Sequence, residues 1–370
     1  MRERMSAASG LLPGLALTAG VAWLGLAASG WIGRDLLGFE KSPVSGIMLA
    51  IVLGMVVGNV FRLPEIFTGG IKFSLARVLR LGIILLGIRL GLGEALKVGA
   101  LAVPLIVLCI VVAGLITYWL GKRLALPRRM TVLIAVGTSI CGATAIMATA
   151  PAIGAEDEET AYAVANITVF GIVAMLLYPY LADGLFGQDP ASAGRFLGTA
   201  IHETAQVAGS GLIHAQVFGG DEVLNVATVT KLMRNLFMVA VIPLMAYWSH
   251  RMATNGGVAA EKLNVLDPFP LFILGFVALA VVRTVGDATL DSGSAFGVFD
   301  AAAWGDLTGE IKRWAERFLG MAMAGVGLGT SIHRLQGLGP KPFCVGLGAA
   351  LAVGAVSLLG IAGLNFLGVG

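Results

Sequence analysis

Residues 136–154 read VGTSICGATAIMATAPAIG, and this stretch decides how the rest of the chain is interpreted. It lies in an apolar segment of membrane-spanning length, yet small and polar residues crowd its middle: Gly137, Thr138, Ser139, Gly142 and Thr144, followed by Pro151. A helix in lipid must satisfy its backbone N–H and C=O groups internally, so irregular backbone is tolerated only where it faces a cavity or other protein. The stretch therefore predicts a broken helix facing a solute near the bilayer midplane, as in secondary transporters. Close helix packing through small residues is the alternative that needs no solute.

The composition is that of an all-α, polytopic membrane protein. Of the 370 residues, 57% are hydrophobic and 13% are charged, whereas soluble domains carry about 25% charged residues. The net charge of +3 gives no reason to expect nucleic-acid binding. The three cysteines lie in apolar segments, so we expect neither a disulfide framework nor a metal cluster. No P-loop stands out, so transport driven by ATP within this chain is not expected. No cleavable signal peptide stands out either.

Hydropathy predicts about eleven membrane segments in a single domain covering 1–370. They lie at 11–29, 44–61, 73–93, 99–121, 130–152, 159–183, 193–218, 223–248, 268–286, 313–332 and 343–368. The stretch 287–311 is rich in Gly, Asp, Ser and Ala and is predicted to be an exposed loop. Most lysines and arginines between segments fall on one side if each segment crosses once, which predicts a cytoplasmic N-terminus. Arg80 and Arg89 flank the third segment and are expected at the interfaces.

Two internal echoes suggest repeats, with approximate halves at 44–183 and 193–368. LGIRLGLGEALKVGALAVPL (86–105) resembles VGLGTSIHRLQGLGPKPFCV (326–345), seven segments later and therefore in the opposite orientation. Such inverted repeats occur in many secondary transporters. GTSICGATAI (137–146) also resembles GTAIHETAQV (198–207), which predicts a second broken helix. This second pair is parallel if both segments cross fully and inverted if one is re-entrant, and glycine-rich composition alone could produce either echo.

Ionisable residues inside membrane segments are costly and indicate function by default. His202 and Glu203 lie beside Gln206, and Lys231 and Arg234 share one helix face three residues apart. A Lys and an Arg near the N-termini of broken helices would form an anion site, because free amides and the positive dipole end lie there. The alternatives are snorkelling of the basic pair, a buried salt bridge from Glu203 to one of them, and a packing role for His202. Asn166 and Thr168 are further candidates for lining the cavity.

The segment HETAQ also resembles part of the zinc-protease motif HExxH, but Gln206 replaces the second histidine. His214, His250 and His333 are scattered, so no third ligand is evident. We therefore predict neither a metal site nor an enzyme.

The motifs GTSICGATAI, GTAIHETAQVAGSG and KLMRN together resemble the signature stretches of the YeiH family of bacterial inner-membrane proteins, which are proposed sulfate exporters. The resemblance extends from about Leu11 to the C-terminus. Thr144, Thr204 and Met233 depart from that pattern, where Ser, Val and Thr are usual. The family looks related to the bile-acid, arsenite, auxin and sodium/proton carriers. That kinship implies inverted repeats, a core and a panel domain, and crossed broken helices.

The residues favour a secondary carrier of a small anion, and the resemblance implies an exporter of an oxyanion such as sulfate, sulfite or a small sulfonate. The expected binding residues are Thr138, Ser139, Cys141, Gly142, Thr144, His202, Glu203, Gln206, Lys231 and Arg234. The alternatives are a proton- or sodium-coupled cation antiporter using Glu203 and His202, and a membrane scaffold or sensor without turnover. No cofactor is expected, and the coupling ion is left open between H⁺ and Na⁺. The expected partners are the anionic solute and the lipid bilayer, with a homodimer as a further candidate.

Overall fold

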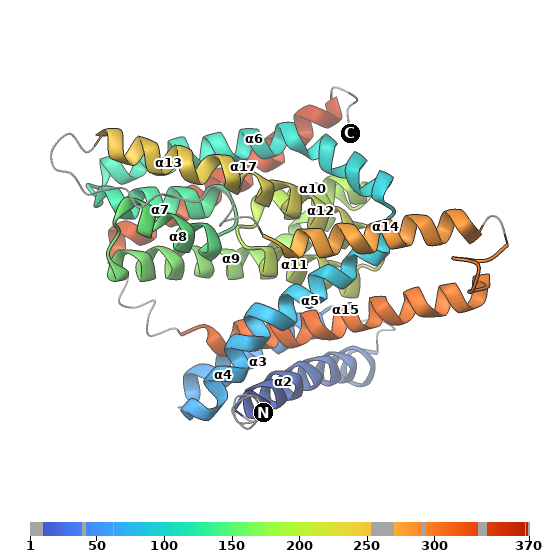
Figure 1. Cartoon of the computed structure of the whole chain (residues 1–370). Helices are drawn as coiled ribbons and strands as arrows, with labels where there is room; N and C mark the ends of the chain where they lie inside the picture. Colours follow the sequence, from blue (N-terminus) through green and yellow to red (C-terminus); the bar gives the residue numbers. More distant parts are fainter. Residues whose placement is uncertain are drawn as a thin grey trace, which may run out of the picture. The chain divides into compact units, whose positions relative to one another are not determined.

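The structure is a computed structural model that describes residues 10–38, 42–61, 63–252, 270–290, 293–331, 339–366 and 368, and the side chains among these except 249–252. Within these ranges the secondary structure is helical, apart from an isolated bridge between Ala295 and Phe299. The chain divides into two compact units, and Figure 1 labels their helices. The first unit comprises Met1–Lys97, Ala208–Asn225 and Leu271–Ile332, and the second comprises Val98–Val207, Val226–Pro270 and His333–Gly370.

Helices of the first unit pack with their backbones close together. The elements of this unit are α2 (Leu12–Trp31), the π-helical turn η1 (Ile32–Leu36), α3 (Gly46–Val60), α4 (Glu65–Phe73), η2 (Ser74–Val78), α5 (Leu79–Leu86), η3 (Gly87–Arg89), α14 (Phe272–Leu290) and α15 (Ala301–Gly329). Helix α3 packs against both α2 and α15. A Cβ atom at Gly327 would lie 2.2 Å from the carbonyl oxygen of Ile51, so only glycine permits this approach. Close contact through small residues is how helices associate in lipid.

The second unit combines the long helices α9 (Asp157–Phe186) and α17 (Pro340–Phe366) with shorter, interrupted ones. The shorter ones are α7 (Arg128–Ser139), α8 (Ala143–Thr149), η4 (Pro151–Ile153), α10 (Pro190–Ala200) and α13 (Met238–Met252). Helices α6 (Leu92–Arg123), α11 (Thr204–Val217) and α12 (Glu222–Leu236) contribute residues to both units. Helix α9 packs against α7, α10 and α17.

Five described helices are long and apolar enough to cross a membrane. They are Leu12–Leu36, Leu92–Arg123, Asp157–Phe186, Phe272–Leu290 and Pro340–Phe366. Helix α12 and the residues Met238–Trp248 of α13 form a sixth candidate, bent by 42°. The chain is therefore a multi-pass helical membrane protein. The predicted number of eleven spans and the inverted repeat stay predictions, and residues 332–338 of the segment 326–345 lie outside the described residues.

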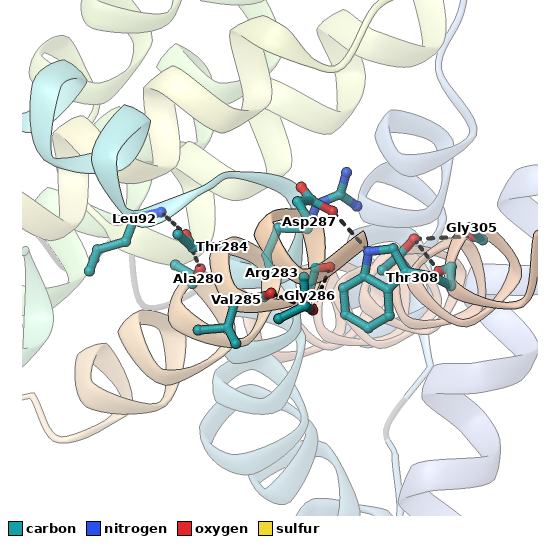
Figure 2. Close-up of polar contacts among 11 residues, drawn as sticks. Leu92, Ala280, Arg283, Thr284, Val285, Gly286, Asp287, Gly305 and Thr308 are labelled. Carbon is teal, nitrogen blue, oxygen red and sulfur yellow. Dashed lines mark hydrogen bonds and ion pairs between the residues drawn. The ribbon is translucent and has the colours of Figure 1, made fainter. Parts of the chain in front are cut away.

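The prediction of an exposed loop at 287–311 is wrong at both ends, because helices extend into this range. Helix α14 continues to Leu290, and α15 already begins at Ala301 because the Asp300 side chain accepts a hydrogen bond from the Ala303 amide at 2.8 Å. One hydrogen bond joins the two helices: Trp304 Nε1 of α15 donates to the Asp287 carboxylate of α14 at 2.8 Å. Within α14, Arg283 Nε donates to the same carboxylate at 2.6 Å, as Figure 2 shows. Hydropathy missed these turns because their residues are small or charged.

Arg89 was expected at an interface, and the structure contradicts this. Its side chain is 1% exposed, with Nη1 lying 2.6 Å from Asp221 Oδ2 and Nη2 lying 2.5 Å from Glu316 Oε1. The two carboxylates come from distant parts of the sequence, so a scan along the chain could not reveal that this cation is paired.

Candidate functional site

Both predicted helix breaks are present in the second unit. Helix α7 ends at Ser139 and α8 begins at Ala143, while α10 ends at Ala200 and α11 begins at Thr204. At the first break Gly142 has φ +70° and ψ −129°, a backbone conformation that residues other than glycine rarely adopt. A Cβ atom at Gly142 would also lie 2.3 Å from Glu203 Cγ. Glycine is therefore required here both for the turn and for the approach of Glu203 from the second break.

Arg234 on α12 ties the two breaks together. Its side chain is fully buried, and three different nitrogens donate hydrogen bonds to backbone carbonyl oxygens. Nε donates to Ser139 at 2.8 Å and Nη2 donates to Thr138 at 2.6 Å, both at the end of α7. Nη1 donates to Thr199 at the end of α10, also at 2.6 Å. A planar guanidinium can hold such divergent acceptors at once because its donors have a fixed fork geometry.

Lys231, one helical turn earlier on the same face of α12, binds the residues that follow these helix ends. Its fully buried ammonium group donates to the carbonyl oxygens of Ile140 at 2.8 Å and Ile201 at 3.0 Å, and also to that of His202. These three hydrogen bonds use all three donors of the ammonium group. Lys231 therefore also joins the two breaks.

The basic pair thus donates its hydrogen bonds to carbonyl groups at the C-terminal ends of α7 and α10 and in the breaks that follow them, and not to a solute alone as the sequence suggested. The last carbonyl groups of a helix have no intrahelical donor and carry partial negative charge. Buried inside the protein, they need donors from elsewhere, and two cations on a neighbouring helix supply them. Snorkelling is also excluded, because both side chains are fully buried.

Glu203 directly precedes α11, and its side chain contacts the N-terminal end of α8 across the first break. Its Oε1 atom accepts from the Ala143 amide and from Thr168 Oγ1, each at 3.4 Å. Among the described residues no ion pair joins it to Lys231 or Arg234, so the salt bridge considered from the sequence is not formed. The carboxylate is only partly buried and is held by two long hydrogen bonds.

Several buried polar atoms around the breaks have no hydrogen-bond partner among the described residues. They are Thr138 Oγ1, His202 Nδ1, Gln206 Oε1, Thr230 Oγ1 and Asn235 Oδ1. Buried polar groups without partners are rare in folded proteins and are common features of functional sites. Gln206 nevertheless is anchored, since its Nε2 donates to the Thr168 carbonyl oxygen at 3.3 Å.

Three further residues that were expected to bind the solute or line its cavity, Cys141, Thr144 and Asn166, make other contacts or face outwards. Cys141 is buried with its Sγ atom 3.2 Å from Met238 Sδ, and Thr144 is exposed on α8. Asn166 donates to the Pro342 carbonyl oxygen at 2.6 Å and so joins α9 to α17.

Asn235 was not among the expected binding residues, although it is a polar residue of the same helix as Lys231 and Arg234; it donates to Thr204 Oγ1 at 2.9 Å. Sequence reasoning also missed the backbone carbonyl groups of Ile140, Thr199 and Ile201, for which the sequence carries no signal.

The charges at the breaks sum to a positive site. By formal charge, Lys231 and Arg234 contribute +2 and Glu203 contributes −1. The C-terminal ends of α7 and α10 offset about half a charge each, while the N-terminal ends of α8 and α11 add about half a charge each. One positive charge is therefore left without a counter-charge from these groups, which favours an anion.

These features define a multi-pass helical membrane protein in which a buried basic pair joins two interrupted helices. Residues 13–346 match the family model described as conserved hypothetical protein 698, and the chain belongs to this family.

Curated relatives similar to the chain are named UPF0324 membrane proteins. The protein from Fusobacterium nucleatum subsp. nucleatum is 31% identical over 334 residues, which is 90% of this chain and 94% of the relative. The protein from Pseudomonas aeruginosa is 33% identical over 348 residues, with coverages of 90% and 88%. The protein from Corynebacterium glutamicum is 34% identical over 320 residues, with coverages of 86% and 85%.

Proposed function

We propose that this protein is a secondary carrier that exports a small oxyanion, such as sulfate, sulfite or a small sulfonate, across the bacterial inner membrane. The observation that carries the proposal is the meeting of two helix breaks at the buried pair Lys231 and Arg234. Discontinuous helices with ionisable groups between them form solute sites in secondary carriers. The resemblance to the YeiH family supports the choice of anion.

In this proposal the basic pair acts mainly through its field and through the shape it imposes on the breaks. All three donors of Lys231 and three of the five N–H donors of Arg234 are already used by backbone carbonyl groups. Direct contacts to the solute then come from the two remaining guanidinium N–H groups, from the first-turn amides of α11 and from the Thr138 hydroxyl. The first-turn amides of a helix lack intrahelical acceptors and favour anions.

A second candidate is a proton- or sodium-coupled cation antiporter that uses Glu203 and His202. It is favoured by one observation, the absence of an ion pair between Glu203 and either basic residue among the described residues. In an anion carrier the same carboxylate would instead repel the solute or hold the coupling ion, H⁺ or Na⁺.

A thermal-shift screen of the purified protein distinguishes the candidates. The ligands are sulfate, sulfite, thiosulfate, taurine, chloride and sodium, each at matched ionic strength. The carrier proposal expects an oxyanion to raise the melting temperature in wild-type protein and in Glu203→Gln, since the carboxylate is not an anion ligand. Stabilisation by sodium alone, abolished in Glu203→Gln, would favour the antiporter and contradict the anion proposal.

A further inference from the structure

A polar pocket of about 330 Å³ lies in the first unit, where the first candidate span ends. It is formed by the end of α2 with η1, by the segment leading into α3, and by one residue of α11. Its polar lining residues are Ser29, Arg34, Ser42, Ser45 and Gln216. The volume is at the lower end of the range of about 300–1,000 Å³ found for ligand pockets. The pocket shares no residue with the two helix breaks.

The groups that line this pocket and remain free are donors. The hydroxyl groups of Ser29 and Ser42 both donate to the Val44 carbonyl oxygen, at 2.7 and 2.9 Å. The Ser45 hydroxyl donates to Gln216 Oε1 at 2.7 Å, and the Ile47 amide donates to the same oxygen at 3.3 Å. The amide oxygen of Gln216 is thus used, and its NH₂ group makes no hydrogen bond with the residues that the structure describes.

Arg34 supplies the positive charge of the pocket. It forms no hydrogen bond or ion pair with any described residue, and its side chain folds back along the helix towards Gly30. A Cβ atom on Gly30 would lie 3.3 Å from Arg34 Nη2. Residues four apart lie on one helix face, so the bare glycine leaves room for the guanidinium within the pocket. The neighbouring carboxylate, Asp35, is not among the lining residues.

The segment that carries the pocket also has exposed apolar side chains. Leu26, a lining residue, is 47% exposed, and Trp31 and Leu36, which do not line the pocket, are 59% and 63% exposed. Tryptophan is enriched where a membrane span meets the headgroup layer, and exposed leucines on a span face lipid chains. The pocket therefore joins a donor-rich, positively charged interior to a surface suited to acyl chains.

We propose that this pocket binds an anionic phosphate headgroup, with the Arg34 guanidinium as its charge partner and the Gln216 amide as a second donor. Arginine suits phosphate oxygens because its planar fork can donate two parallel hydrogen bonds. The volume accommodates a glycerophosphate group, while the acyl chains of a lipid would leave the pocket past Leu26. The same chemistry would also accept a free organic phosphate.

Native mass spectrometry of the full-length protein, purified in detergent and then titrated with phosphatidylglycerol, tests the proposal. The variants are Arg34→Gln, Gly30→Leu, which fills the pocket without removing the charge, and Arg123→Gln as the matched control. Arg123 is likewise an exposed arginine at the end of a candidate span, stacked on Trp119, but it is outside the pocket. We expect the affinity for the tightest-bound phosphatidylglycerol to fall about tenfold or more in Arg34→Gln and in Gly30→Leu and to stay unchanged in Arg123→Gln.

Further arms of the same experiment identify the source of the phosphate. Phosphatidylcholine, whose headgroup carries a cation, is expected to bind weakly and to be insensitive to Arg34→Gln. Competition by glycerol phosphate would support the site and identify a soluble ligand, whereas its failure to compete would support the site and identify a lipid. Equal retention of phosphatidylglycerol by wild-type protein and Arg34→Gln would overturn the proposal, as would equal losses in Arg34→Gln and Arg123→Gln. Circular dichroism of each variant confirms that a loss of binding is not a loss of fold.

Discussion

At the scale of single residues, Arg234 replaces hydrogen-bond partners that the ends of two helices lack. Removing it would leave the carbonyl groups of Thr138, Ser139 and Thr199 without these donors. Each unsatisfied buried group costs about 1–3 kcal/mol. We therefore expect Arg234→Ala to lower the free energy of unfolding by several kcal/mol. Arg234→Lys should also be destabilising, because one ammonium nitrogen cannot take the three separate positions from which Nε, Nη1 and Nη2 reach Ser139, Thr199 and Thr138. Melting temperatures in one detergent measure both variants, and Arg123→Lys, at an exposed arginine, should melt like the wild type.

The partner of Arg234 can be checked with the double variant Glu203→Gln, Arg234→Ala. If the Glu203 carboxylate were the partner of Arg234, Arg234→Ala would leave a buried negative charge without a partner. Glu203→Gln would remove that charge and restore stability. The structure instead has Arg234 on carbonyl oxygens, so the double variant should melt no higher than Arg234→Ala alone. A recovery of more than half of the lost melting temperature would show that the two side chains are paired after all.

Gly142 makes a second prediction at the residue scale. Gly142→Ala places a side chain at φ +70° and into contact with Glu203 Cγ, so we expect a loss of about 1–3 kcal/mol from backbone strain alone. Gly20→Ala is the matched control, since nothing lies within 4 Å of a Cβ atom at this helical glycine of α2. The control should be neutral or slightly stabilising. Equal melting temperatures for the two variants would argue against the tight turn at the first break.

At the scale of elements, α10 begins with a side-chain cap that titrates. The Asp189 carboxylate accepts from the Ser192 amide at 3.0 Å. Partial burial raises its pKa, but hydrogen bonds from Ser192 and the nearby charge of Arg195 lower it, and the resulting pKa is below the ordinary value of Asp. A depressed pKa in the folded state means that the ionised cap stabilises the protein above the unfolded pKa. That contribution is lost as the pH falls through the folded value.

We therefore expect wild-type protein to be more stable than Asp189→Asn at neutral pH, because the neutral amide lacks the charge that favours a helix N-terminus. The difference in melting temperature should shrink as the pH is lowered below about 4, where the carboxylate of the wild type becomes protonated. A series of melting curves from pH 7 to pH 3 on both proteins measures this. A difference that stays constant over the series would mean that the charge of Asp189 does not stabilise α10.

The junction of α14 and α15 gives a prediction with a matched control on the same pair of helices (Figure 2). A Cβ atom at Gly286 would lie 2.2 Å from Cζ2 of the Trp304 ring, whereas one at Gly305 would meet nothing within 4 Å. Gly286→Ala must therefore displace the indole and strain its hydrogen bond to Asp287. We expect it to lower the melting temperature, as overpacking typically costs about 1–3 kcal/mol, while Gly305→Ala does not. Destabilisation by both variants alike would mean that helix propensity rather than packing is responsible.

The sequence predicts those elements whose residues carry a local signal. Gly, Thr and Ser within apolar segments indicate both helix breaks, and spacing places Lys231 and Arg234 on one face. The role of this pair could not be predicted, because its partners are backbone oxygens of residues such as Ile140 and Ile201. The apolar side chains of these residues give no sign that their carbonyl groups accept hydrogen bonds from cations. Helix α4 and the first turns of α15 were missed because they are too polar or too short for a hydropathy scan. Burial of Arg89 depends on Asp221 and Glu316, which only the fold brings near.

At the scale of the whole molecule, a membrane chain keeps two fully buried cations beside a carboxylate with which they form no ion pair. Burying charges in lipid is costly, so such a cluster is expected to persist because function requires it. Lys231 and Arg234 hold two interrupted helices at one place, and the excess positive charge favours an anionic solute. The inverted repeat, the homodimer and the orientation in the membrane remain predictions that follow from the sequence.

Counterflow in proteoliposomes tests the central claim, that the two joined helix breaks form the solute site of an oxyanion carrier. Vesicles are loaded with unlabelled sulfate, sulfite or taurine, and uptake of the labelled solute is followed for wild-type protein, Lys231→Met and Gly20→Ala. We expect rapid exchange of at least one oxyanion by the wild type and Gly20→Ala, and a loss of at least tenfold in Lys231→Met at matched amounts of folded protein. Exchange in Lys231→Met at the wild-type rate, or none in the wild type with any oxyanion, would contradict the account.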